Sequence, residues 1–139
     1  MTDQKQELKD YVEKWYAVFP KGDAEAMSSL YTEDARLLLA NLPKVVGASA
    51  IGDFLGSFPT HADMDCRYEV TDIDFLTDDI AVVTGSGWVE SKPKAGGDAV
   101  HDASRFLMVM KKDSVSGKWR CHYDASQHTP DVAYKDRPA

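Results

Sequence analysis

Cysteines are few in this chain, and patterns that bind metals are missing. Cys66 and Cys121 lie far apart and lack CxxC spacing, so two reduced core thiols are a better expectation than a disulfide. The histidines form no HxH or HxxxH pair and no carboxylate-linked group typical of a metal site; they are His61, His101, His122 and His128. We therefore expect no metal and no other cofactor.

Positive charge and long apolar runs are scarce as well. The chain has 16 Lys and Arg against 23 Asp and Glu, a formal net charge of −7. Because binding to a phosphate backbone needs a basic stripe, we expect no nucleic-acid partner. No apolar run is long enough for a membrane span, and the N-terminus lacks the apolar core of a signal peptide. We expect a cytoplasmic protein without membrane association.

The length of 139 residues suits one domain with a hydrophobic core. Apolar residues make up 43% of the chain and charged residues 28%, which argues against disorder. We assign residues 1–6 to an N-terminal tail, residues 7–130 to a single domain and residues 131–139 to a polar, loosely held C-terminal tail.

Helical periodicity dominates the first part of the sequence. The apolar positions Leu8, Tyr11, Val12, Trp15 and Phe19 predict an amphipathic helix that ends near Phe19, before a proline. A short second helix is predicted over residues 24–31, and a third over residues 49–58, ending before another proline. Two glycines within the third helix each cost about 1 kcal/mol relative to Ala, so tertiary packing must stabilise it.

The periodicity becomes strand-like after residue 65. Residues 67–76 and 80–91 predict one antiparallel pair, and residues 104–111 and 118–126 predict a second around the turn at 113–117. A short buried strand is predicted at residues 37–39. Helices followed by strands indicate an α+β fold with about three helices covering one face of a mostly antiparallel sheet.

The last predicted strand carries an unusually polar face. Alternation of side chains puts His122, Asp124 and Ser126 on one side of this strand, about 6 to 7 Å apart in successive pairs. In the preceding strand, Ser104 shares one face with Phe106 and Met108. The polar face either looks at water or lines a cavity. In a cavity, His122 and Asp124 could act together as acid and base.

Three groups of residues resemble the SnoaL-like branch of the nuclear-transport-factor-2-like superfamily. They are Gly22-Asp23-xx-Ala26-Met27-xx-Leu30-Tyr31-xx-Asp34-Ala35, then Pro43-x-Val45-x-Gly47-xx-Ala50-Ile51-xx-Phe54, and Gly117-Lys118-Trp119-Arg120-x-His122-Tyr123-Asp124. The resemblance covers roughly residues 7–130. It implies a conical barrel, in which a curved sheet wraps around a long first helix and encloses a pocket. It also implies a homodimer formed through the sheet.

The resemblance does not carry one activity, because the superfamily contains isomerases, dehydratases, cyclases, epoxide hydrolases and non-catalytic adaptors. The catalytic positions of ketosteroid isomerase fall on or near Leu39, Trp15 and Ser104, so its base and its oxyanion donors are absent. The SnoaL-like cyclases use a pocket carboxylate with a neighbouring imidazole. The resemblance therefore implies His122 and Asp124 as candidate catalytic residues.

Two functions remain open from the sequence. The first is a pocket that binds a small apolar molecule and acts as a metal-free lyase, isomerase or cyclase through His122 and Asp124. The residues expected to contact the ligand are Trp15, Phe54, Phe58, Ser104, Phe106 and Met108. The second is a non-catalytic dimeric module that binds a ligand or a partner protein.

A homodimer is expected on either reading. Trp119, Cys121 and Tyr123 alternate with the polar set on the last strand. If the polar set faces the pocket, these apolar side chains lie on the convex face of the sheet and need a partner to cover them.

Overall fold

The order of helices and strands places one long helix across a curved sheet. The structure is a computed structural model that describes residues 3–128 and 133–139. The helices are α1 (Gln4–Val18), α2 (Ala24–Ser28) and α3 (Ala48–His61), with short 3₁₀ turns at Phe19–Lys21 and Tyr134–Asp136. The strands are β1 (Tyr31–Leu38), β2 (Val45–Val46), β3 (Ala62–Phe75), β4 (Ile80–Pro93), β5 (Val100–Lys112) and β6 (Trp119–Gln127). Among the described residues, no helix is long and apolar enough to cross a membrane.

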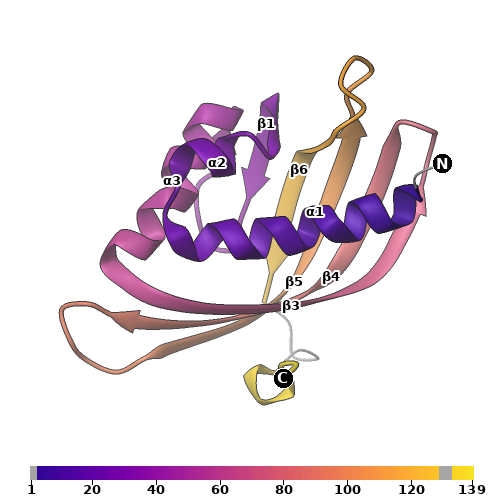
Figure 1. Cartoon of the computed structure of the whole chain (residues 1–139). Helices are drawn as coiled ribbons and strands as arrows, with labels where there is room; N and C mark the ends of the chain where they lie inside the picture. The colour runs from indigo at the N-terminus through magenta and orange to yellow at the C-terminus, as the bar shows by residue number, and fades with distance from the viewer. Residues whose placement is uncertain (1–2, 129–132) are drawn as a thin grey trace.

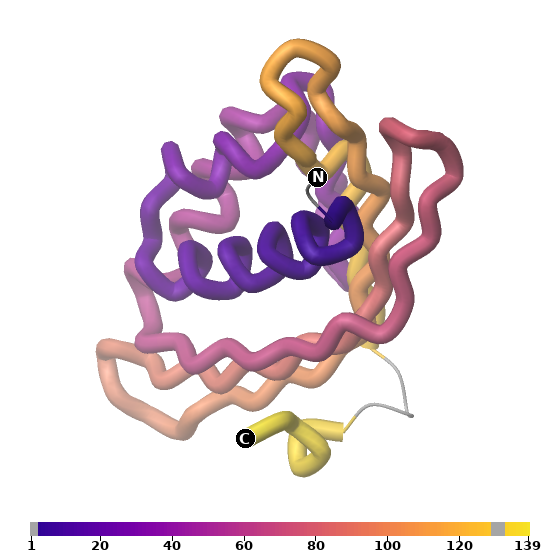
Figure 2. Tube along the Cα trace, turned by 45° about the vertical axis from the view of Figure 1, so that its right-hand side comes forward, coloured from indigo at the N-terminus to yellow at the C-terminus, as the bar shows by residue number. Residues whose placement is uncertain are grey.

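Within these residues the strands form one six-stranded sheet in the order β2-β1-β6-β5-β4-β3. Strands β1 and β6 run parallel, and the other neighbours are antiparallel. The sheet curls around α1, which crosses its concave face, while α2 and α3 close one end (Figures 1 and 2). The predicted α+β class, with helices on one face of a curved and mostly antiparallel sheet, is confirmed.

Helix α1 forms as its sequence predicts. Asp3 caps the N-terminus, where its side chain accepts a hydrogen bond from the backbone N–H of Lys5 at 3.0 Å. Its buried face carries Leu8, Tyr11 and Val12, which pack against the concave side of the sheet. The helix begins at Gln4, so the domain boundary predicted at residue 7 lies inside it.

Helix α3 departs from the sequence prediction at its C-terminal end. The predicted stop before Pro59 is wrong, since the helix continues to His61 and buries Pro59. Proline costs the helix one backbone hydrogen bond, and burial of its ring offsets part of that cost. Gly52 and Gly56 allow α2 to pack closely: a Cβ at Gly52 would overlap the carbonyl oxygen of Ala24. Tertiary packing therefore stabilises this helix, as expected.

The sequence pattern does not predict most of strand β1. It predicts a helix at residue 31 and a strand only at residues 37–39, whereas β1 spans Tyr31–Leu38. Its buried residues are Tyr31, Ala35 and Leu37, and a register shift toward β6 interrupts the alternation between the first two. Because the residues at this irregularity include the charged Glu33 and Asp34, neither helical nor strand periodicity marks the segment.

Of the three β6 residues expected to form a dimer interface, two lie inside the core. Trp119 and Cys121 are buried on the concave side, where Trp119 Nε1–H donates to a Glu7 carboxylate oxygen of α1 at 3.1 Å. The expectation that they lie on the convex face is wrong. The homodimer remains a prediction, and the positions of Trp119 and Cys121 do not support it.

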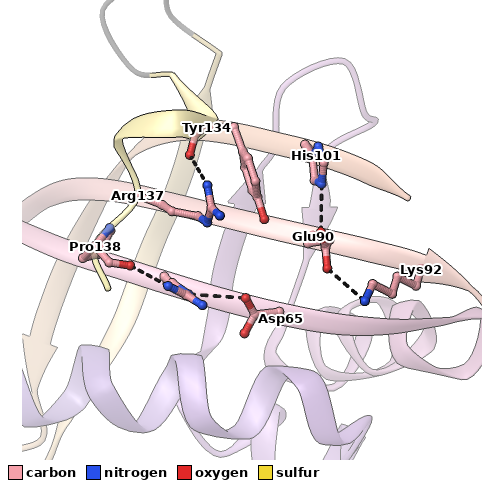
Figure 3. A network of polar contacts seen from close by, with 8 residues as sticks. Asp65, Glu90, Lys92, His101, Tyr134, Arg137 and Pro138 are labelled. Carbon is pink, nitrogen blue, oxygen red and sulfur yellow. Dashed lines mark hydrogen bonds and ion pairs between the residues drawn. The ribbon is translucent and has the colours of Figure 1, made fainter. Parts of the chain in front are cut away.

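The end of the chain packs on the outer face of the sheet. Trp88 Nε1–H donates to the carbonyl oxygen of Ala133 at 2.8 Å. Arg67 donates to the carbonyl oxygen of Pro138 at 2.8 Å, the contact drawn as a dashed line at Pro138 in Figure 3. The Tyr134 ring stacks on His101 with their centroids 4.1 Å apart. The expectation of a loosely held tail is therefore wrong for residues 133–138; residues 131 and 132 lie outside the described part of the chain.

Removal of residues 133–139 is expected to expose Trp88. This side chain points away from the core cluster and is only 4% exposed, because the C-terminal segment covers it. The truncated protein should show red-shifted tryptophan emission and lose about 2 kcal/mol of unfolding free energy through lost burial. The same truncation in a Trp88→Phe background serves as the control and should leave the emission spectrum unchanged. An unshifted spectrum in the truncated protein with Trp88 present would refute this packing.

Candidate functional site

A cavity of about 290 Å³ lies between the helices and the concave face of β4, β5 and β6. Most of its wall is apolar and includes Trp15, Tyr16, Phe19, Phe58, Phe106 and Met108. Its polar wall residues come from the three strands and from the residue directly after β6; they are Ser91, Asp102, Ser104, Asp124, Ser126 and His128. An apolar enclosure with a few polar groups is typical of a small-molecule site, and the volume is near the lower end for such sites.

A larger hollow of about 740 Å³ lies at the start of α3. The carboxylates in its wall, Glu33 and Asp53, are exposed, and no histidine lines it. Exposed carboxylates remain hydrated, and they lack the apolar enclosure that is typical of a small-molecule site. The smaller cavity is therefore the candidate site.

Asp124 is a buried carboxyl group in the wall of this cavity. It lies on β6 opposite Met108 of β5 and is 4% exposed. Tyr31 Oη–H donates to Asp124 Oδ2 at 2.6 Å, and Trp15 Nε1–H donates to Tyr31 Oη at 2.8 Å. Three side chains from α1, β1 and β6 thus form one line of hydrogen bonds that ends on the carboxyl group.

Burial changes the acidity of the groups in this line. It raises the pKa of Asp124 from 3.8 to about 6, although the hydrogen bond from Tyr31 acts in the opposite direction. Burial, and then the negative charge of Asp124, raise the pKa of Tyr31 well above its usual value. Tyr31 is therefore a neutral donor at physiological pH, while Asp124 exchanges its proton close to that range.

The apolar wall is built from stacked aromatic rings. Trp15 stacks on Phe19 with centroids 5.0 Å apart, and Phe19 meets Phe58 edge to face at 6.1 Å. Phe54 packs edge to face against Phe58 at 5.2 Å but does not line the cavity. These contacts fix the shape of the wall, because each ring is held by another ring of the same cluster.

Most of the predicted ligand-binding residues meet at this cavity. Those that line it are Trp15, Phe58, Ser104, Phe106 and Met108, together with the predicted catalytic residue Asp124. Phe54 lies behind the wall, and His122 lies elsewhere. The cavity is also lined by the three positions compared with ketosteroid isomerase, Leu39, Trp15 and Ser104.

The predicted pairing of His122 with Asp124 is wrong. Val109 pairs with Tyr123 but Met110 pairs with Cys121, so His122 is an extra residue in a bulge of β6. A bulge reverses the alternation, which brings Cys121 and Asp124 to the concave side. His122 instead contacts β1, where its Nδ1 lies 2.8 Å from Thr32 Oγ1.

Three residues of the site are not predicted from the sequence. The pattern puts Tyr31 at the end of a helix, although it begins β1 and donates a hydrogen bond to Asp124. The other two are Asp102 and His128, which line the cavity with His128 Nδ1 3.0 Å from Asp102 Oδ1. Asp102 comes two residues before Ser104, and His128 comes two residues after Ser126. Strand alternation carried one step further in each strand therefore predicts that both face the cavity.

The sequence and the fold of this chain are similar to those of known proteins. The chain matches the family model of the SnoaL-like domain over residues 12–122. A ketosteroid isomerase-like protein from Erwinia carotovora atroseptica is 20% identical, with 94% of this chain and 100% of that chain covered and a TM-score of 0.81. A candidate scytalone dehydratase from Novosphingobium aromaticivorans is 14% identical, with 91% and 84% covered and a TM-score of 0.83.

A nuclear transport factor 2-like protein from Salmonella enterica serovar Typhimurium is 15% identical, with 95% of each chain covered and a TM-score of 0.80. At such identities the likeness shows the fold alone. A search of curated proteins finds no match. Because the family model covers most of the chain, this protein belongs to the SnoaL-like domain family.

Proposed function

We propose that the protein binds a small, largely apolar carbonyl compound in the cavity and that Asp124 moves a proton on it. One observation carries this proposal: a buried carboxyl group whose pKa is raised to about 6 forms part of an otherwise mostly apolar cavity wall. A general base works best when its pKa lies near the working pH. The activity would be that of an isomerase, lyase or cyclase.

The arrangement supports a simple division of roles. The Asp124 carboxylate takes a proton from the carbon next to the carbonyl group, and Tyr31 holds the carboxyl in place through its hydrogen bond. Ser104 and Ser126 line the same cavity and offer hydroxyl groups to the carbonyl oxygen. Two structures similar in fold are named for ketosteroid isomerase and scytalone dehydratase, names that suit proton transfer.

Non-catalytic ligand binding is the second candidate. The observation that favours it is that His122 lies outside the cavity, so Asp124 has no imidazole beside it. Leu39, at the position of the ketosteroid isomerase base, also cannot accept a proton. On this reading, the same cavity holds an apolar compound without changing it.

The two functions are separated by deuterium exchange into acetophenone in heavy water. If Asp124 removes a methyl proton, the resulting enolate takes up deuterium, which proton NMR detects as loss of the methyl signal. The rate catalysed by the protein should rise with pH as Asp124 ionises, with its midpoint at about pH 6, and then level off. Binding of acetophenone without any exchange above the buffer rate would favour the non-catalytic function.

A further inference from the structure

The mouth of the cavity carries a second pair of ionisable side chains. His128 and Asp102 both line the cavity, and His128 Nδ1 lies 3.0 Å from Asp102 Oδ1. Their side chains are 51% and 43% exposed, whereas Asp124 is 4% exposed. The pair therefore lies where the cavity opens to solvent, and Asp124 lies at the inner end.

The strands set the distance between these two ends. Asp124 is paired with Met108 and Ser126 with Phe106, so the inward-facing residues of β5 and β6 run side by side toward the mouth. Each two-residue step along a strand covers about 6.6 Å, which places the Cα atoms of Asp124 and His128 roughly 13 Å apart. Ser104 and Ser126 lie between the ends. A ligand that touches both ends must be elongated.

The surroundings of the His128 ring decide which nitrogen carries the proton. Nδ1 faces two acceptors, Asp102 Oδ1 and the backbone carbonyl oxygen of Ala103, which lies 3.5 Å away. A nitrogen between two acceptors must be the N–H donor, so in the neutral ring Nε2 keeps its lone pair. The nitrogen left for a ligand is therefore a hydrogen-bond acceptor.

The charges at the mouth restrict the ligand further. The Asp102 carboxylate forms part of the wall, and the chain has a formal net charge of −7. An anionic group would be repelled by both, whereas a neutral hydroxyl group can donate to Nε2 without that cost. Neighbouring serine hydroxyls on the same wall suit a polar end group of this kind.

We propose that His128 and Asp102 form a second binding subsite, which accepts a hydrogen bond from a hydroxyl group at the far end of an elongated, otherwise apolar carbonyl compound. His128 would bind the hydroxyl group directly, and Asp102 would position its ring. This subsite deepens the proposed function and rests on it, because it assumes that the ligand occupies the cavity.

The test uses three probes that share one carbonyl end: 4-hydroxyacetophenone, acetophenone and 4-acetylbenzoate. Their affinities are measured at one neutral pH from the quenching of tryptophan fluorescence, since Trp15 lines the cavity. The wild-type protein should bind the hydroxyl compound about fivefold more tightly than acetophenone, the effect of one net hydrogen bond. It should bind the carboxylate compound most weakly. In His128→Leu, the ratio of the first two affinities should fall to about one.

His101→Leu is the matched control, because His101 also pairs with a carboxylate, Glu90, at 2.9 Å, but on the outer face of the sheet. That variant should keep the wild-type ratio, and thermal melting verifies that both variants are folded. The proposal is overturned if the wild type shows no preference for the hydroxyl compound, if His128→Leu keeps the preference, or if none of the probes binds. A preference that persists while deuterium exchange is absent would overturn the proton-transfer role of Asp124 and support this subsite.

Discussion

Replacement of Asp124 by Asn is expected to slow deuterium exchange into acetophenone by at least ~100-fold, the lower end of what a general base contributes. Asn has nearly the shape of Asp, and its carbonyl oxygen can still accept the hydrogen bond that Tyr31 donates at 2.6 Å. The variant loses only the group that can take up a proton. Proton NMR of the methyl signal, recorded with wild type and variant at equal concentration, measures the effect.

Two control variants show whether the loss belongs to the cavity. Asp65→Asn removes a carboxylate from the outer face, where Asp65 pairs with Arg67 at 3.3 Å, and should keep the exchange rate. His122→Gln should also keep it, because His122 contacts β1 outside the cavity. Full exchange by Asp124→Asn would remove Asp124 from the mechanism, and a large loss in His122→Gln would restore the pair predicted from the sequence.

The stability of the protein should depend on pH through the same carboxyl group. Its pKa is 3.8 in a solvated chain and about 6 in the folded protein, because burial disfavours the charged form. Between these values the unfolded chain binds fewer protons than the folded one, so the free energy of unfolding falls as pH rises. At about 1.4 kcal/mol per pKa unit, the loss is about 3 kcal/mol. It is absent below pH 3.8 and complete above about pH 6.

Urea unfolding of wild type and Asp124→Asn across this pH range isolates the contribution of Asp124. The other carboxyl groups titrate in both proteins, so their effects cancel in the difference between the two free energies of unfolding. Relative to the variant, the wild type should lose about 3 kcal/mol on going from acid to neutral pH. A difference that stays constant with pH would show that Asp124 is not buried in its neutral form. A gain with rising pH would instead indicate a salt-bridged carboxylate.

Regular strands made part of the site predictable from the sequence. In β5, alternation without interruption correctly placed Ser104, Phe106 and Met108 on the cavity side. In β6 the same rule failed, because a bulge at His122 inserts one residue and no glycine or proline marks it. Asp124 reached the cavity, but the histidine expected beside it did not.

Long-range contacts explain what else the sequence could not predict. Tyr31 joins the site because β1 pairs with β6, some ninety residues later in the chain. The charged residues Glu33 and Asp34 follow soon after it, so no apolar alternation marks the strand. The C-terminal segment is polar in sequence, yet its backbone carbonyls accept hydrogen bonds from Trp88 and Arg67. Local periodicity carries no information about either contact.

The most direct measurement is the titration of the Asp124 carboxyl carbon by carbon-13 NMR, assigned by comparison with the Asp124→Asn variant. The proposed function requires a carboxyl group that is buried in a mostly apolar wall and exchanges its proton near physiological pH. We expect a midpoint at about pH 6. A midpoint near 3.8, the value of a solvated aspartate, would contradict the account, because the carboxylate would then be too weak a base to act as proposed.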